Sequence, residues 1–279
     1  MSIFHSNYYR SSTGNRLTGF PRYLEILEQN IKKFFLANLI TLIGFLPFSI
    51  GIVLSLLSSS VLLLIPSCVI GGIFAGPALS GMYDLIMRSL RDASKDWWSN
   101  YKHAWRQNWR QSLLPGIIFC LMLGFYIFMG MLFWWSVRFP GLGTLALFVC
   151  SLLIFTMFFS ICWPQIVLFD QTFLQCVKNS LLFMLRFLPK TAGIALLQIL
   201  FWILMVLFLP WSAFLLPVIG VWFILYTANF LIYDTFNNVF ELENKIAEAF
   251  PEQTPFYEND EAWLKRKQEE SNSDEHIDC

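Results

Sequence analysis

Charged residues are scarce in this sequence. They make up 14% of its 279 residues, whereas apolar residues make up 56%. A soluble domain carries roughly a quarter charged residues. Several apolar runs reach or approach the length of about 20 residues that a helix needs to cross a bilayer. The sequence therefore predicts a polytopic membrane protein. Its apolar runs are continuous rather than alternating, which favours helices and excludes a β-barrel.

Motifs of catalysis and metal binding are also missing. The sequence contains no phosphate-binding G-x-x-x-x-G-K-[ST] loop, no H-E-x-x-H, and no Ser/His/Asp or Cys/His set at one membrane depth. The histidines His5, His103 and His276 are far apart and have no metal-ligand spacing. We therefore predict no enzyme activity, no catalytic, cofactor-binding or metal site, no cofactor, and no nucleic-acid partner.

Cysteines form no C-x-x-C pair, and most of them lie in apolar runs. We interpret them as small hydrophobic residues and expect no disulfide framework. The six positions are Cys68, Cys120, Cys150, Cys162, Cys176 and Cys279.

The apolar runs predict an all-α integral membrane protein with six transmembrane helices. The helices would form three hairpins, with amphipathic helices in the membrane interface on the cytoplasmic side. The spans are expected at about residues 34–57, 61–83, 113–135, 142–169, 191–209 and 214–233. Together they form a membrane domain over 21–235, which follows a flexible arm (1–20) and precedes a helical extension (236–250) and an acidic, disordered tail (251–279). The first apolar run begins near Phe34, so we expect no cleavable signal peptide.

The cations are distributed asymmetrically. With six spans, eighteen of the nineteen Lys and Arg residues fall on one side, and the exception is Arg138. Cytoplasmic loops carry the excess of cations in membrane proteins. We therefore expect both termini to lie in the cytoplasm.

Small residues recur every four positions in the second span, at Gly72, Gly76 and Ser80. Such a stripe lets helix backbones approach closely in lipid. Helix packing is the favoured interpretation, and a substrate-lining groove is the alternative.

Aromatic residues and cations alternate after the second span. Trp98, Tyr101, Trp105 and Trp109 fall on one helical face, and Arg106 and Arg110 flank it together with Lys102. With Trp97, they are typical of a helix lying in the membrane interface and facing lipid. A sugar-stacking or nucleic-acid surface is the alternative.

The spans also indicate three copies of one unit, in which a basic amphipathic helix, two spans and an aromatic-Asp pair follow one another. The acids of these pairs are Asp84, Asp170 and Asp234. Repeats with the same orientation imply a pseudo-rotation axis along the membrane normal; chance similarity among apolar sequences is the alternative. Each acid would pair with a cation of the next insert, cap the next helix, or contribute to an ion or proton site.

Two stretches resemble a known family. Residues 76–84 read G-P-A-L-S-G-M-Y-D, and residues 96–112 read D-W-W-S-N-Y-K-H-A-W-R-Q-N-W-R-Q-S. With Asn38 and the pair Leu46-Pro47, these segments resemble the YesL family (domain of unknown function 624) over about residues 30–235. The resemblance implies a bacterial membrane protein associated with carbohydrate uptake, and it implies no catalytic residues.

Three functions follow as hypotheses. The first is a non-catalytic scaffold or accessory subunit that supports another membrane protein, such as a sugar transporter. The second is a small-solute transporter or channel, and the third is a protein that interacts with membrane lipids through its Trp/Arg helix. The polar residues within the spans, Asn38, Gln165, Gln198 and Asn229, are expected to form hydrogen bonds between helices.

Overall fold

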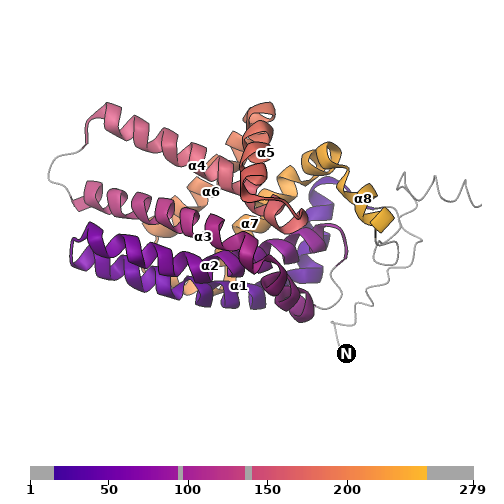
Figure 1. The fold of residues 1–279 in the computed structure, drawn as a ribbon, viewed down its shortest axis with the longest axis horizontal. Helices are drawn as coiled ribbons and strands as arrows, with labels where there is room; N and C mark the ends of the chain where they lie inside the picture. Colours follow the sequence, from indigo (N-terminus) through magenta and orange to yellow (C-terminus); the bar gives the residue numbers. More distant parts are fainter. Residues whose placement is uncertain (1–15, 94–96, 136–139, 250–279) are drawn as a thin grey trace, which may run out of the picture. The chain divides into compact units, whose positions relative to one another are not determined.

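The fold is known from a computed structural model that describes residues 16–93, 97–135 and 140–249. These residues form helices and turns, and they include no strand. The helices are α1 (Gly19–Leu57), α2 (Val61–Leu90), α3 (Trp97–Trp135), α4 (Leu142–Leu168), α5 (Phe173–Arg186), α6 (Leu188–Leu207), α7 (Trp211–Phe240) and α8 (Leu242–Ala249) (Figure 1). The predicted arm and tail lie largely or wholly outside the described residues.

Six helices, α1, α2, α3, α4, α6 and α7, are long and apolar enough to cross a membrane. Each overlaps one of the six predicted spans, so the number of spans agrees with the sequence analysis. Their combined pattern is that of a multi-pass membrane protein. The helical extension predicted after residue 235 consists of the end of α7 and the short helix α8.

The chain divides into two compact units. Unit 1 comprises Met1–Lys32, Arg88–Lys95 and Tyr233–Cys279, and unit 2 comprises Lys33–Met87 and Asp96–Ile232. Unit 2 therefore holds nearly all of the apolar helix length, whereas unit 1 holds the polar ends of α1, α2 and α7 together with α8.

Two of the three predicted amphipathic helices are not separate elements. Residues 21–33 form the beginning of α1, and residues 97–112 form the beginning of α3. Only the third is a helix of its own, α5, which ends at Arg186; Phe187 alone separates it from α6. Pro189 explains this break, because its ring cannot donate a backbone hydrogen bond and clashes with the preceding turn.

Within unit 2, α2 packs between α1 and α3. Gly71 of α2 lies against the backbone of Phe48 in α1, and Gly76 of α2 lies against Gly116 of α3. Side chains of these three helices form an apolar core cluster that includes Phe48, Cys68 and Cys120.

The remaining helices of unit 2 continue this order of neighbours. α4 packs against α3, α5 and α6, and α5 crosses α4 near its end (Figure 1). Phe201 of α6 contacts Phe223 of α7, and Phe34 of α1 stacks on Trp222 of α7. Contacts thus connect the six apolar helices of unit 2 in the order α1, α2, α3, α4, α6, α7 and from α7 back to α1. Tyr83 of α2 also stacks on Trp163 of α4.

Tryptophans mark both ends of the apolar part of α3. Trp109 lies near its beginning, and Trp134 and Trp135 lie at its end, where both are exposed. Trp109 and Trp134 are about 37 Å apart along the axis at 1.5 Å per residue. This separation exceeds the roughly 30 Å hydrocarbon core and approaches the 40–45 Å that includes the headgroups. Trp prefers these interfaces, so α3 has the dimensions of a spanning helix.

Candidate functional site

Helix α7 is interrupted in the middle of its apolar stretch. Pro217 lies inside the helix, and Gly220 has φ −38° and ψ −109°, which are not helical values. Pro217 has no backbone N–H to donate to the preceding turn. The break at Gly220 also disrupts the helical hydrogen bonds of the backbone groups on either side of it. In lipid these backbone groups need partners within the protein, because no water is available to them.

Asn38 of α1 supplies those partners. Its side-chain Nδ2 donates to the carbonyl oxygens of Leu216 (3.1 Å) and Pro217 (2.8 Å). Its Oδ1 accepts from the backbone N–H groups of Val221 (3.0 Å) and Trp222 (3.3 Å). The side chain is 0% exposed. One buried amide therefore bridges both sides of the break and joins α7 to α1.

A pocket of about 270 Å³ lies between α3, α4 and α5. Its lining combines one cation and several polar side chains with apolar ones: Arg110, Gln111, Leu114, Ile166, Gln171, Thr172, Phe173 and Cys176. Thr172 forms a capping box with Gln175, which fixes the first turn of α5 beside the pocket.

Amide and hydroxyl side chains next to this pocket form a hydrogen-bond network. The buried Gln165 donates to Ser180 Oγ (3.1 Å) and accepts from Gln171 Nε2 (3.3 Å). Gln171 in turn accepts from Asn179 Nδ2 (3.1 Å). The bonds connect α4, the α4–α5 loop and α5, so these polar groups satisfy one another.

Two cysteines meet in the same region. Cys162 of α4 and Cys176 of α5 are both buried, and their Sγ atoms are 3.4 Å apart. Cys176 also lines the pocket, and its thiol lies 3.6 Å from the carbonyl oxygen of Cys162. The sequence analysis missed this pair, because its members are fourteen positions apart in the chain.

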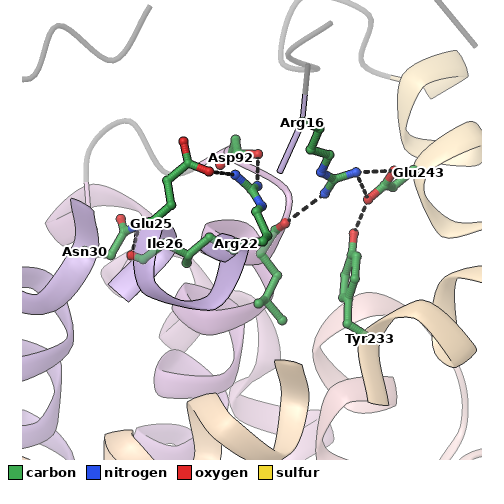
Figure 2. A network of polar contacts seen from close by, with 9 residues as sticks. Arg16, Arg22, Glu25, Ile26, Asn30, Asp92, Tyr233 and Glu243 are labelled. Carbon is green, nitrogen blue, oxygen red and sulfur yellow. Dashed lines mark hydrogen bonds and ion pairs between the residues drawn. The ribbon is translucent and has the colours of Figure 1, made fainter. Parts of the chain in front are cut away.

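Unit 1 contains a network of ion pairs (Figure 2). Arg16 donates from Nη1 to both carboxylate oxygens of Glu243 at 3.0 Å and from Nη2 to the carbonyl oxygen of Leu90 at 3.1 Å. Tyr233 Oη donates to Glu243 Oε1 at 2.6 Å. Burial lowers the pKa of Arg16, but Glu243, Tyr233 and Asp92 together outweigh this effect, and the net pKa lies above its ordinary value. Arg16 therefore stays charged at every physiological pH and joins the end of α2 to α8.

Arg22 forms the second part of this network. Its guanidinium binds Glu25 Oε2 at 3.0 Å and also pairs with Asp92, which follows α2. The residue is 6% exposed. A guanidinium at this depth needs its two carboxylates, because burying an unpaired charge is costly. These ion pairs hold the beginning of α1, the α2–α3 connection and α8 together in unit 1.

The Trp/Arg segment is placed only partly as expected. Trp97, Trp98, Trp105, Trp109, Arg106 and Arg110 are all exposed or half-buried. Tyr101, however, is only 2% exposed, and its hydroxyl donates to the carbonyl oxygen of Ala78 at 3.2 Å. The assignment of Tyr101 to the lipid-facing set was therefore wrong. The buried face of this part of α3 runs through Tyr101, Ala104, Asn108 and Ser112, where smaller side chains allow contact with α2.

The small residues of α2 line close contacts. A Cβ atom on Gly76 would lie 2.5 Å from the carbonyl oxygen of Ser112, and one on Gly72 would lie 2.5 Å from Cα of Ile117. Ser80 is buried, and its hydroxyl donates to the carbonyl oxygen of Pro77 at 2.8 Å within α2. Gly72 and Gly76 thus allow the backbones of α2 and α3 to approach, whereas the hydroxyl of Ser80 forms its hydrogen bond within α2.

The three acids of the proposed repeats occupy different environments. Asp84 is buried inside α2, which continues to Leu90, and Asp234 is exposed inside α7. Asp170 lies in the α4–α5 loop, where it accepts a hydrogen bond from Gln111. None of them caps a helix, because α2 and α7 continue past the predicted ends and Thr172 caps α5. The prediction of helix caps was wrong.

Two further polar residues of the spans differ in their bonding. Gln198 of α6 donates to Ser160 Oγ of α4 at 2.8 Å, as predicted. Asn229 donates instead to the carbonyl oxygen of Leu225 in its own helix, and its Oδ1 has no partner. The expected interhelical bond of Asn229 was therefore wrong. Among the described residues, no group of three or more His, Cys, Asp or Glu side chains could hold a metal ion.

Part of the chain matches a known protein family. Residues 34–130 match the family described as "Protein of unknown function, DUF624". This stretch has the DUF624 pattern. YesL-like is another name for DUF624, so the resemblance seen in the sequence is confirmed over these residues. Searches of curated proteins and of solved structures found no match.

The DUF624 match covers the apolar part of α1, all of α2 and most of α3. It includes Asn38 and the Gly76–Gly116 contact, whereas the break in α7 that Asn38 bridges lies outside it. The expected extent of the resemblance was longer, to about residue 235. The family description states no activity.

Proposed function

We propose that this protein is a non-catalytic scaffold or accessory subunit of the bacterial cytoplasmic membrane, and that it supports a carbohydrate-uptake transporter. Both termini and the Trp/Arg part of α3 would face the cytoplasm, in contact with lipid headgroups. The cation asymmetry supports this orientation, and the carbohydrate link comes from the resemblance to the YesL family.

One observation carries the proposal: three of the four amide side chains of the spans, Asn38, Gln165 and Gln198, bond to other helices of the protein. Asn38 uses both atoms of its amide on the α7 backbone, and Gln165 and Gln198 bind hydroxyls of neighbouring helices. At Gly76 and Gly116 the backbones of α2 and α3 approach so closely that a methyl group would overlap. No solute can pass between α2 and α3 at this point. These features favour a rigid membrane body that binds a partner.

The test is co-purification from the native membrane in mild detergent, followed by quantitative mass spectrometry. We expect a transporter subunit in an amount comparable to the bait, and a fall in uptake of that transporter's sugar when the gene is deleted. Another six-span protein with the same tag serves as control. Recovery of the bait alone, with unchanged sugar uptake in the deletion strain, would contradict the proposal.

A small-solute transporter is the second candidate, and the break in α7 favours it. Transporters commonly bind solutes and ions at interrupted membrane helices, where backbone groups are freed from the helix. Here Asn38 occupies those groups, so a solute would have to displace its amide. Solute flux into proteoliposomes that contain the protein alone, and a change of that flux in Asn38→Leu, would favour this candidate over the scaffold.

A further inference from the structure

We propose that Cys162 and Cys176 form a dithiol that reacts with low-molecular-weight disulfides, with Cys176 as the attacking thiol and Cys162 as the resolving thiol. The inference is independent of the proposed scaffold function. It rests on the distance between the two sulfur atoms and on the pocket that Cys176 lines.

The geometry brings the two thiols into contact. Their Sγ atoms are 3.4 Å apart, on α4 and α5, and each side chain is buried. A disulfide bond needs about 2.05 Å between the sulfurs, with suitable side-chain dihedral angles. Closing this gap requires a shift of somewhat more than 1 Å, which small rotations of two cysteine side chains can supply. Either thiol can donate a hydrogen bond to the other.

The pocket gives a reagent a route to one thiol only. Cys176 belongs to its lining, whereas Cys162 does not, and Arg110, Gln111 and Thr172 line the same space. Arg110 favours reagents that carry carboxylates, as small biological disulfides such as oxidised glutathione do. Cys176 is 1% exposed, so slender reagents should reach it more readily than bulky ones.

The surroundings also favour the thiolate that the reaction needs. The hydrogen bond with Cys162 lowers the pKa of the Cys176 thiol. Thiolates, and not thiols, attack disulfides. If α5 lies on the cytoplasmic side, as the cation distribution predicts, a bond between these cysteines would be transient, since cytosolic thiols are kept reduced.

The reaction balances in two steps. The Cys176 thiolate attacks one sulfur of a disulfide RSSR, the S–S bond of the reagent breaks, and RS⁻ leaves and takes up a proton. The Cys162 thiolate then attacks Cys176 Sγ, the mixed disulfide breaks, and the second RS⁻ leaves and is protonated. The protein dithiol is oxidised to a disulfide between α4 and α5, and RSSR is reduced to two RSH.

The test treats the full-length protein, purified in detergent, with oxidised glutathione and then analyses alkylated peptides by mass spectrometry. We expect a Cys162–Cys176 disulfide in the wild type and a glutathione adduct on Cys176 in Cys162→Ser. Cys176→Ser should give neither product at position 162. Cys68 and Cys120 are the internal control, because both are buried but neither lines this pocket, and they should remain thiols.

Three outcomes would overturn the proposal. One is that both thiols stay free in the wild type at reagent concentrations that oxidise exposed thiols. Another is that Cys68 and Cys120 react as fast as Cys176. The third is that Cys162→Ser folds, as judged by its elution and thermal transition, and carries no adduct on Cys176. Should Cys162→Ser not fold, the wild-type peptide analysis alone decides the proposal.

Discussion

Asn38 shows how a single polar side chain can determine the course of a membrane helix. Its four hydrogen bonds satisfy backbone groups on both sides of the break at Gly220 in α7. The sequence identified Asn38 as a polar residue in an apolar run, but its partners are about 180 positions away. In the sequence, the break is indicated only by Pro217 and by Gly220 three residues later. The periodicity of apolar residues does not reveal it.

Replacing Asn38 by leucine should therefore destabilise the protein strongly. The substitution keeps the number and branching of the side-chain heavy atoms but removes the bonds of Asn38 to two carbonyls and two N–H groups of α7. Each unpaired buried group costs about 1–3 kcal/mol, so with partial relaxation we expect a loss of roughly 3 kcal/mol. Thermal unfolding in detergent, followed by tryptophan fluorescence, measures it.

Gln198→Leu is the matched control for this prediction. Gln198 is also a buried amide within a span, but it makes a single side-chain bond, to Ser160. Such a bond contributes about 0.6 kcal/mol on average in membrane proteins. Equal transition temperatures for the two variants would show that Asn38 does not bridge the break.

Arg22 and Asp92 allow a second test at the scale of residues. Arg22 is largely buried and contacts the carboxylates of both Glu25 and Asp92. Arg22→Met should destabilise unit 1 more than Asp92→Asn, because it removes a guanidinium that contacts two carboxylates. A double-mutant cycle of the two substitutions should give a coupling free energy on the order of 1–3 kcal/mol. Additive effects of the two substitutions on unfolding would contradict this pairing.

At the scale of elements, the backbones of α2 and α3 approach each other closely at Gly76 and Gly116. A Cβ atom added to Gly116 would lie 2.6 Å from Cα of Gly76 and 2.7 Å from the carbonyl oxygen of Gly72. These are backbone atoms, which cannot move aside without separating the helices. The four-residue spacing in α2 indicated one side of this contact. The same spacing occurs in α3 at Ser112, Gly116, Cys120 and Gly124, and it was the unused signal for the other side.

Gly116→Ala should therefore destabilise the protein by about 1–3 kcal/mol, as expected for overpacking. Gly130→Ala is the control in the same helix, because its added Cβ would have no atom within 4 Å. Alanine there should be neutral or stabilising by up to about 1 kcal/mol through helix propensity. Thermal unfolding of both variants in the same detergent measures the difference, and equal shifts would argue against the α2–α3 contact.

Sequence patterns predicted the apolar helices better than the ends of the helices. Lengths of apolar runs identified all six long helices, because transfer to lipid depends on composition. The amphipathic stretches gave no sign of whether they continue into a span. Residues 97–112 continue into α3 although Pro115 follows them, whereas α5 ends at Arg186, three residues before Pro189, and a new helix begins at Leu188. The assignment of Tyr101 was wrong for a related reason. The spacing of aromatic residues does not identify the exposed face of α3, because the buried face is the one that carries Ala104, Asn108 and Ser112.

For the whole molecule, the order of neighbours in unit 2 is the order that three successive hairpins around one axis would have. The pairs α1–α2, α3–α4 and α6–α7 follow one another in the ring of contacts. The different settings of Asp84, Asp170 and Asp234 show that any repeat does not extend to these acids. The pseudo-rotation axis stays a prediction, as does the cytoplasmic position of both termini.

The most direct test of the account is the labelling of single introduced cysteines in intact cells with a membrane-impermeant maleimide. Gly141→Cys lies in the α3–α4 link, and Lys102→Cys lies on the basic part of α3; both positions are exposed. The control is the protein with neither introduced cysteine. We predict that position 141 is labelled in intact cells and that position 102 is labelled only after permeabilisation. Labelling of position 102 from outside, with position 141 protected, would contradict the membrane arrangement proposed here.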